Sequence, residues 1–198
     1  MARTIAKDYD QKRGQILKVA ANVFATEGFD RASMSQLAKA CGISKANIYH
    51  YYSGKDALLF DILDTYLSAL RDKICSAAPA NLAPEDRFRA TVSAILLAYQ
   101  GADDEHRVQG GGFAMLPGDQ RDILRGYQKD LVKHLSDIVQ AIAPEVFQDE
   151  KTKLHAATMS VFGMLNWFYM WNSKADAKAR EDYANIVSNL TLSGVRGL

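Results

Sequence analysis

Residues 33–52, "SMSQLAKACGISKANIYHYY", carry the pattern that decides the fold. Ser33 is followed three residues later by Gln36, which is the spacing of a capping box at a helix start. Gly42 lies where a left-handed residue lets the chain reverse, and Ser44 can cap a second helix. The apolar residues of both segments are Leu37, Ala38, Cys41, Ile43 and Ile48, and they supply a shared interior. The stretch therefore predicts a helix-turn-helix.

The polar residues of this stretch suit DNA. In a helix-turn-helix the second helix enters the major groove, and its first residues reach the base edges. Asn47 can pair bidentately with adenine, and Lys45 can contact phosphate or guanine. Backbone and phosphate contacts are expected from Ser33, Ser35, Lys39, Ser44, Tyr49, His50, Tyr52 and Lys55. Lys55 beside a helix N-terminus is also a natural anion site.

Charge is distributed unevenly along the 198-residue chain, although the formal net charge is only +1. Residues 1–55 hold nine Lys or Arg and four Asp or Glu, a net charge of +5, so the remainder carries −4. A basic first quarter on a mildly acidic body favours a protein that presents one end to a polyanion. The alternative interpretation is a chance fluctuation of surface charge.

Helical periodicity continues on both sides of the helix-turn-helix. Apolar residues recur from Ile16 to Phe24, and Gly28 ends that helix. Further helices are predicted over residues 54–75, 84–100, 119–143, 149–172 and 177–195, whereas three glycines (110–112) and Pro117 interrupt residues 102–119. We expect an all-α protein of about nine helices. A three-helix head over residues 1–54 would precede a helical body over residues 55–198.

Residues 16–59, "ILKVAANVFATEGFDRASMSQLAKACGISKANIYHYYSGKDALL", resemble the DNA-binding domain of TetR-family transcriptional regulators. The matching features are a first helix ending in "F…EGF", then "SMSQLAKACGIS", "IYHYY" and "GKDALL". They cover the first third of the chain, and the all-helical remainder fits the family's ligand-binding and dimerisation domain. The family often has Gly, Phe and Ser where Ala46, Tyr52 and Gly54 stand. Ala46 is still small enough to face the groove closely, so these departures concern base preference rather than class.

The resemblance implies a homodimeric repressor that binds a palindromic operator and is released by a small hydrophobic effector. The two heads of such a dimer match successive major grooves about 34–36 Å apart, so a small rotation of each head ruins the fit. The long helix from Lys55 is the expected lever, and effector and DNA would bias one equilibrium in opposite directions. The last two helices, with Tyr183, Ile186, Val187 and Leu190 at helical spacing, are expected to form the dimer interface.

The segment "FGMLNWFYMW", residues 162–171, is apolar on almost every side, which is typical of a helix buried on two faces. One face could line an effector pocket while the other packs on a partner subunit, and a plain core helix is the alternative. The glycines at 110–112 could form a pocket wall or only a turn. The residues expected to line the pocket are Tyr99, Phe113, Met115, Tyr127, Met164, Trp167, Met170 and Trp171.

Residues 116–135 and 162–171 are similar to parts of TetR-family members that respond to acyl-CoA thioesters. This resemblance would place Arg121, Arg125, Lys129 or Lys133 against CoA phosphates. The alternative role of these four cations is a solvated helix face. The alternative ligand is a hydrophobic, drug-like molecule.

The sequence shows no pattern for catalysis, metal binding or membrane insertion. Its four His lack metal-ligand spacing, and neither a Gly-x-Ser-x-Gly motif nor a phosphate-binding glycine loop is present. We therefore expect no enzyme, cofactor or metal. With no recognisable signal peptide or membrane span, and only Cys41 and Cys75, a cytoplasmic protein without disulfides is expected. An all-helical lipid carrier or enzyme without DNA binding is the main competing function, and a regulator that answers to a protein partner is the second.

Overall fold

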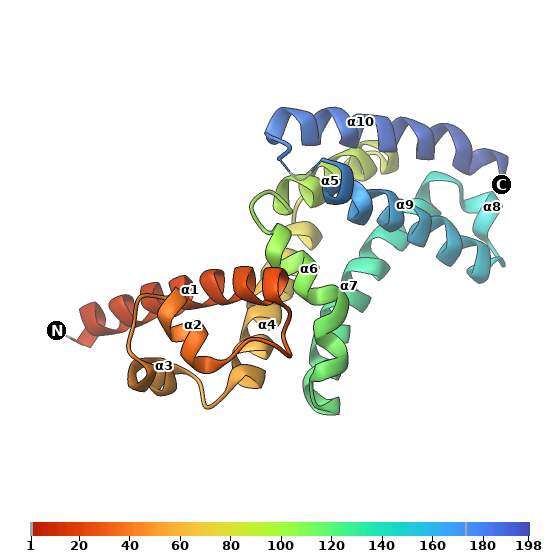
Figure 1. Ribbon diagram of the computed structural model, residues 1–198. Coiled ribbons are helices and arrows are strands. Elements are labelled where there is room, and N and C mark those ends of the chain that lie inside the picture. Colours follow the sequence, from red (N-terminus) through yellow and green to blue (C-terminus); the bar gives the residue numbers. More distant parts are fainter. Residues whose placement is uncertain (1, 173) are drawn as a thin grey trace. The chain divides into compact units, whose positions relative to one another are not determined.

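The computed structural model describes residues 2–172 and 174–198, and within them every regular element is a helix (Figure 1). This confirms the all-α prediction. The α-helices are α1 (Ala2–Glu27), α2 (Met34–Ala40), α3 (Lys45–Tyr51), α4 (Lys55–Cys75), α5 (Pro84–Ala98), α6 (Asp103–Gly112), α7 (Gly118–Ile142), α8 (Pro144–Phe147), α9 (Lys151–Trp171) and α10 (Ala177–Gly194). Two 3-10 turns, η1 (Phe113–Met115) and η2 (Val195–Gly197), complete the set.

The chain packs as two compact units. Unit 1 contains the residues up to Tyr66 together with residues 104–124, and unit 2 contains residues 67–103 and 125–198. The predicted head of residues 1–54 is therefore part of a larger compact unit. That unit also includes the first half of α4, nearly all of α6 and the start of α7.

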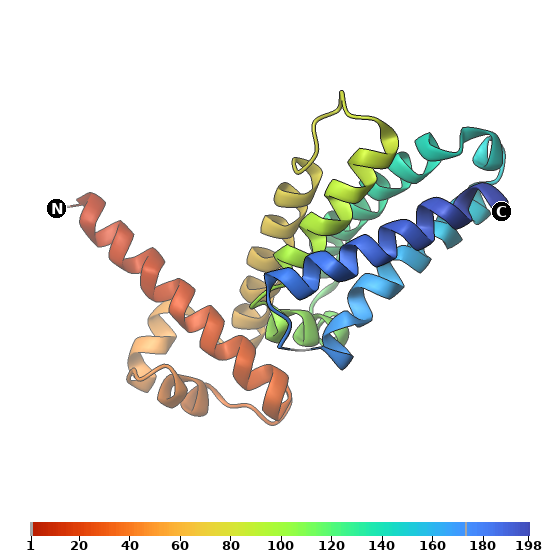
Figure 2. The ribbon, with the colours of Figure 1, turned by 90° about the horizontal axis from the view of Figure 1, so that it is seen from above.

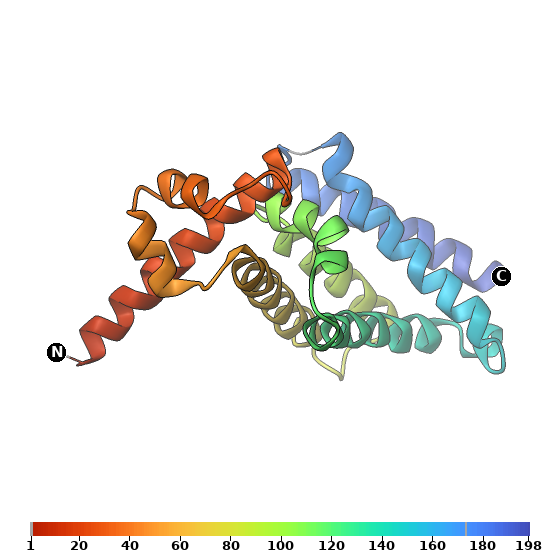
Figure 3. The same ribbon diagram turned by 60° about the horizontal axis from the view of Figure 1, so that its bottom comes forward.

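The core of unit 1 explains why its short helices hold together. α1, α2 and α3 lie beside one another at the start of the chain (Figure 3). Their fully buried side chains include Ile16 and Ala20 of α1, Leu37 of α2 and Ile48 of α3. Helices as short as α2 and α3 are marginal on their own, so this shared apolar interior supplies most of their stability.

In unit 2, α10 packs along α5 and also contacts α9 (Figure 2). Phe88 of α5, Leu135 of α7, Leu165 of α9 and Val187 of α10 are fully buried. Val187 therefore faces the core of its own chain, although the helical spacing had placed it in the predicted dimer interface.

α6 runs through the three glycines that were expected to interrupt it. A Cβ added at Gly112 would lie 3.2 Å from Leu59 Cδ1 and 3.3 Å from Leu63 Cδ1. Glycine at this position therefore lets the end of α6 approach α4 closely. Glycine lowers the helix propensity of α6, and this close packing offsets that cost. The packing depends on residues of α4, so the local sequence of α6 could not indicate it.

We expect Gly112→Ala to lower the free energy of unfolding by about 1–3 kcal/mol, because the added methyl group overpacks the contact with α4. The matched control is Gly110→Ala in the same helix, where a Cβ would meet nothing within 4 Å. It should raise stability by about 0.5–1 kcal/mol through helix propensity. Urea unfolding of both variants measures the difference. Shifts of the same sign would contradict the close packing.

Candidate nucleic-acid interface and body

The helix-turn-helix is built by local hydrogen bonds. Ser33 Oγ accepts from the Gln36 N–H at 3.3 Å, and the Gln36 side chain accepts from the Ser33 N–H at 3.0 Å, which completes the predicted capping box. Gly42 adopts φ +65°, the left-handed conformation that the turn requires. Ser44 Oγ accepts from the Asn47 N–H at 3.1 Å and so caps α3.

α3 presents a polar outer face. Ile48 is its one buried residue among the seven, so the face opposite Ile48 points away from the head. At 100° per residue that face is centred on Ala46 and His50, with Asn47 and Tyr49 on its flanks. The predicted DNA contacts that are exposed are Ser33, Ser35, Lys39, Ser44, Lys45, Ala46, Asn47, Tyr49 and His50. They lie on α2, on the turn and on α3.

Two predicted DNA contacts have protein partners instead, so their expected role is corrected. Tyr52 is buried, and its hydroxyl donates to Asp61 Oδ2 at 2.6 Å. Lys55 Nζ donates to the main-chain oxygens of Phe29 and Asp30 at 2.9 and 3.1 Å. The same ammonium lies 4.5 Å from the centroid of the Phe29 ring. Both residues tie segments of unit 1 together, and neither presents a free donor to a phosphate.

Asp61 of α4 and Arg13 of α1 were not predicted from sequence. Arg13 Nε donates to Asp61 Oδ2 at 2.8 Å, and a second guanidinium nitrogen donates to the other carboxylate oxygen. This hydrogen bond raises the pKa of Arg13. Burial, reinforced by the Asp61 carboxylate, raises the pKa of Tyr52, so the Tyr52 hydroxyl remains a donor.

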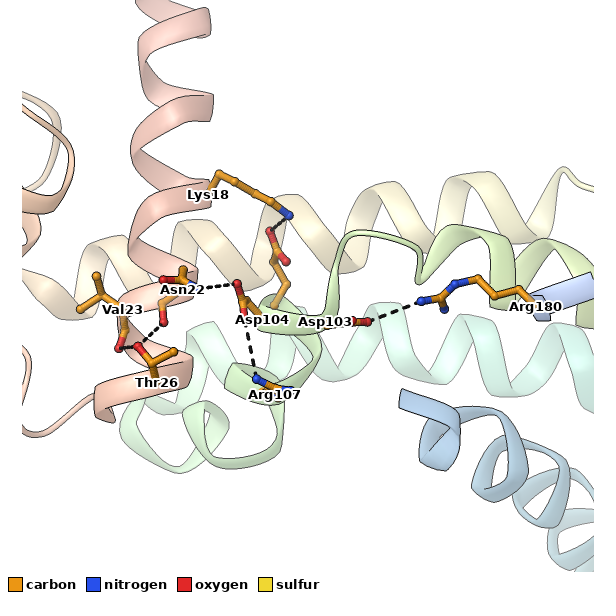
Figure 4. A network of polar contacts seen from close by, with 9 residues as sticks. Lys18, Asn22, Val23, Thr26, Asp103, Asp104, Arg107 and Arg180 are labelled. Atoms are coloured by element: carbon orange, nitrogen blue, oxygen red, sulfur yellow. Dashed lines mark hydrogen bonds and ion pairs between the residues drawn. The ribbon is translucent and has the colours of Figure 1, made fainter. Parts of the chain in front are cut away.

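The first turn of α6 is bound to α1 by polar side chains (Figure 4). Asn22 Nδ2 donates to Asp104 Oδ2 at 2.9 Å, and Lys18 Nζ donates to Glu105 Oε1 at 3.3 Å. The first turn of a helix also favours carboxylates, because their negative charge lies at the positive end of the helix dipole. The start of α6 is therefore fixed to α1 within unit 1.

Arg180 is the most unusual residue of unit 2, since it is a cation with 2% exposure (Figure 4). Its guanidinium donates to the main-chain oxygens of Ala175 and Leu96, both at 3.2 Å. One nitrogen lies 3.8 Å from Asp103 Oδ1, and the guanidinium carbon lies 5.7 Å from the Phe168 ring centroid. No sequence pattern indicated this burial, because arginine near a helix start is ordinarily exposed.

Three of the residues expected to line an effector pocket lie on the outside of α9. Trp167, Met170 and Trp171 are 62%, 54% and 59% exposed. The Trp171 ring lies edge-to-face with the Phe168 ring, with 4.9 Å between ring centroids. Their pocket-lining role therefore stays a prediction, and in this chain taken alone the three side chains lie on the surface. A helix that is apolar all round gives no period from which its inward face could be deduced.

The other five predicted pocket residues are distributed over both units. Tyr99 is buried and donates to Asn166 Oδ1 at 2.7 Å, and burial raises its pKa. The ring of Tyr127 lies 4.7 Å from the Arg71 guanidinium, and Met164 lines a groove between α9 and α10. The remaining two, Phe113 and Met115, belong to unit 1.

Unit 1 contains a cavity of about 380 Å³, lined by α6, η1 and the end of α1 with the loop that follows. Met115, Gly111 and Gly112 form part of its wall. The glycine segment thus borders a cavity as well as packing on α4. Phe24 of α1 and Phe29 of the loop that follows it contribute apolar side chains to the lining.

Three of the four predicted phosphate-binding cations share a groove. Arg125, Lys129 and Lys133 of α7, with His155 of α9, line a groove of about 490 Å³. Lys133 is also paired with Asp137 at 2.6 Å. The fourth cation, Arg121, lies in unit 1 and is not part of this groove.

A second groove, of about 370 Å³, runs between α9 and α10. Its lining includes the small residues Ala156, Ala157, Ser160 and Gly194 as well as the larger Leu190. Ile186 and Leu190 of α10 are exposed, at 54% and 62%. Exposed large apolar side chains beside a groove of small residues are typical of a protein–protein interface.

Two kinds of feature are absent from the described residues. No helix among them is long and apolar enough to cross a membrane. In residues 2–172 and 174–198 there is also no cluster of three or more His, Cys, Asp or Glu placed to hold a metal ion.

Two family models match the chain. The model described as bacterial regulatory proteins, tetR family, matches residues 16–62. The model described as tetracyclin repressor-like, C-terminal domain, matches residues 81–195, which is more than half of the chain.

Relatives and solved structures agree with these models. The chain is 26% identical over 209 residues to the transcriptional repressor NicS of Pseudomonas putida, covering 96% of this chain and 95% of NicS. It spans only 65% and 39% of two other curated regulators that it matches. All of these proteins are transcriptional regulators rather than enzymes.

A TetR-family regulator from Bordetella parapertussis is 31% identical, with a TM-score of 0.84 over 94% of this chain and 96% of that one. AibR, solved in complex with isovaleryl coenzyme A and operator DNA, is 23% identical. Its TM-score is 0.75 over 90% of this chain and 97% of AibR, which shows a shared fold.

Proposed function

The chain belongs to the TetR family of bacterial transcriptional regulators, and we propose that it is a homodimeric, ligand-responsive repressor. It would bind a palindromic operator in the cytoplasm and release it when a small hydrophobic effector binds the body. The observation that carries the proposal is the exposed polar face of α3, displayed by a helix-turn-helix with a basic surround. The repressor NicS, which matches along nearly the whole chain, supports the sign of regulation.

The α3 face suits the major groove in shape and chemistry. Ala46 and His50 face directly outward, and the small Ala46 lets the helix backbone approach the bases. Asn47 on the flank can read adenine through two hydrogen bonds. Lys39 and Lys45 add cations that neutralise phosphates, and both are exposed.

The test begins with selection of a binding sequence from a random DNA pool by the purified protein, which we expect to enrich a palindrome. Alanine at Lys39 or Lys45 should weaken binding to every sequence about threefold to tenfold and reduce the salt slope by about 1, as expected for a lost phosphate contact. Alanine at Asn47 should relax preference at one operator position by about 1–3 kcal/mol. Fluorescence anisotropy over a salt series measures all three.

The outcomes separate the competing functions. A carrier or enzyme without DNA binding would enrich no sequence. Unchanged base preference in the Asn47 variant would remove Asn47 from the set of base-reading residues. Lys73→Ala, an exposed lysine near the end of α4 and outside unit 1, is the matched control and should leave both affinity and salt slope unchanged.

The second copy of the chain would dock on α9 and α10. Trp167, Ile186 and Leu190 are exposed there, next to the groove of small residues. Pairing two such helices with those of a partner would form a four-helix bundle and bury these side chains. This interface would explain why large apolar side chains such as Trp167 are exposed in a single chain.

We propose an acyl-CoA thioester as the effector. The cationic groove of Arg125, Lys129 and Lys133 supplies positive charge for phosphates, and AibR, a relative in fold, binds isovaleryl coenzyme A. Native mass spectrometry of the purified protein would identify a co-purifying ligand. Added isovaleryl coenzyme A should dissociate the operator complex. If an uncharged hydrophobic compound dissociates the complex and none of a series of acyl-CoAs does, the effector is not an acyl-CoA.

A further inference from the structure

A single carboxylate joins three helices of unit 1 behind the proposed DNA-reading face. We infer that Asp61 is a positioning residue for DNA recognition, which holds α3 at a fixed rotation through the hydroxyl of Tyr52. The inference rests on the proposed function, because it concerns how that face is presented to DNA. It adds two residues, Asp61 and Arg13, that touch no DNA and yet set the geometry of recognition.

α3 is weakly held by its own burial. It has seven residues, and Ile48 is the only one that is buried. A short helix attached at one apolar side chain can roll about that contact. A roll of about 20° moves the tip of an outward side chain by about 2 Å at the helix's outer radius of about 5 Å. That displacement is several times the spread of good hydrogen-bond distances, so base reading needs a second attachment.

Tyr52 supplies the second attachment. It follows α3 directly, one turn beyond Ile48, and its N–H donates to the Ile48 main-chain oxygen at 3.0 Å. Its buried ring carries the hydroxyl to Asp61 Oδ2 at 2.6 Å. A hydrogen bond to a carboxylate at this distance is short and charge-assisted, and such bonds are about twice as strong as neutral ones.

Asp61 is itself held in place. The Arg13 guanidinium of α1 donates to both of its oxygens, and the Thr65 hydroxyl of α4 donates to Oδ1 at 3.4 Å. The Arg13 charge balances the partly buried carboxylate, whose side chain is 19% exposed. The acceptor that α3 meets therefore has a fixed position on α4, set from the α1 side as well.

The hydroxyl, rather than the ring, is the distinguishing group. A phenylalanine would fill the same space but could not bond to Asp61. The neighbouring Tyr51, the last residue of α3, stacks on Tyr9 of α1 with ring centroids 4.9 Å apart. That stack alone is a sliding contact, so removing the Tyr52 hydroxyl should loosen the rotation of α3 without unfolding it.

The experiment compares Tyr52→Phe and Asp61→Asn with wild-type protein on the DNA sequence selected by the wild type. We expect both variants to bind this operator about tenfold more weakly, since a bond to a charged partner is lost. Binding to non-specific DNA and the salt slope should stay within about twofold, because the phosphate contacts remain. The double variant should be little weaker than either single variant, because Tyr52→Phe removes the bond itself and Asp61→Asn removes the charge that strengthens the same bond.

Tyr66→Phe is the matched control. It also removes a tyrosine hydroxyl from unit 1, where the Tyr66 oxygen lies 3.2 Å from His106 Nδ1, and α3 is not involved. It should bind the operator as the wild type does. Circular dichroism at the assay temperature confirms that each variant is folded, and hydrogen exchange at the α3 amides should rise in Tyr52→Phe and in Asp61→Asn but not in Tyr66→Phe.

Three results would overturn the inference. Operator affinity of folded Tyr52→Phe within twofold of Tyr66→Phe would show that the hydroxyl does not position α3. An equal loss of operator and non-specific affinity would assign Asp61 a purely structural role. If the wild-type protein enriches no sequence at all, the proposed function fails and this inference fails with it. The first two results, in contrast, would overturn the inference and leave the proposed function intact.

Discussion

Leu190→Asp is expected to convert the protein from a dimer to a monomer and to weaken operator binding by more than about 100-fold. Leu190 is 62% exposed on α10 and lines the groove between α9 and α10. In the proposed bundle the new carboxylate would be buried against apolar side chains without a partner, at a cost of several kcal/mol per subunit. The twofold symmetry introduces it twice in one interface.

The loss of DNA binding follows from the loss of the dimer. One head reaches only half of a palindromic operator, so a monomer forfeits the second set of contacts and the benefit of linking them. Analytical ultracentrifugation measures the oligomeric state, and anisotropy with the selected operator measures affinity. The α3 face itself is unchanged in this variant.

Leu82→Asp is the control, because Leu82 is also an exposed leucine, at 39%, but lies between α4 and α5. It should remain dimeric with wild-type affinity for the operator. A dimeric Leu190→Asp protein would remove α10 from the interface, and a monomeric wild-type protein that still binds a palindrome tightly would remove the need for a dimer.

Local chemistry made the head predictable from sequence. The Ser33–Gln36 capping box, the turn at Gly42 and the cap at Ser44 each depend on residues within four positions, and all three are present. A pattern of neighbours therefore determines where α2 and α3 begin and which way α3 faces. Ile48, as the inward residue, follows from the same pattern.

Partners that are distant in sequence limited the rest. Lys55 and Tyr52 have the composition of DNA contacts, but the Phe29 carbonyl lies 26 residues from Lys55, and Arg13 lies 48 residues from Asp61. The helical periodicity of the sequence does not reveal pairs of residues so far apart in the chain. The same holds for Gly112, whose role depends on Leu59 and Leu63 across the fold.

The apolar α9 segment failed for a different reason. Its hydrophobicity indicated a helix buried on two faces, whereas Trp167 and Trp171 are exposed in this chain. The sequence alone indicates that this apolar surface packs against something. It does not indicate whether the contact is a ligand, the core of the same chain or a second subunit. The distribution of exposed side chains on α9 and α10 is what favours the second subunit.

Arg180→Ala is expected to lower the free energy of unfolding by about 3–5 kcal/mol, as for one partner removed from a buried ion pair. The 2% exposed guanidinium is held by the main-chain oxygens of Leu96 and Ala175 and by Asp103. Alanine would leave these acceptors without their donor and open a cavity beside Phe168. Arg180→Met retains more volume and should cost less than alanine.

Arg196→Ala is the matched control within unit 2. It removes an ion pair with Glu85 at 2.6 Å, shorter than the 3.8 Å between Arg180 and Asp103, yet both partners are exposed. Because water and salt screen such a pair, its loss should cost less than about 1 kcal/mol. Urea unfolding at a fixed protein concentration compares the two, followed by the fluorescence of Trp167 and Trp171, the two tryptophans of the chain. Equal costs would mean that contact distance, and not burial, sets the contribution of these arginines; a larger cost for Arg180 assigns it to burial and to the acceptors left unpaired.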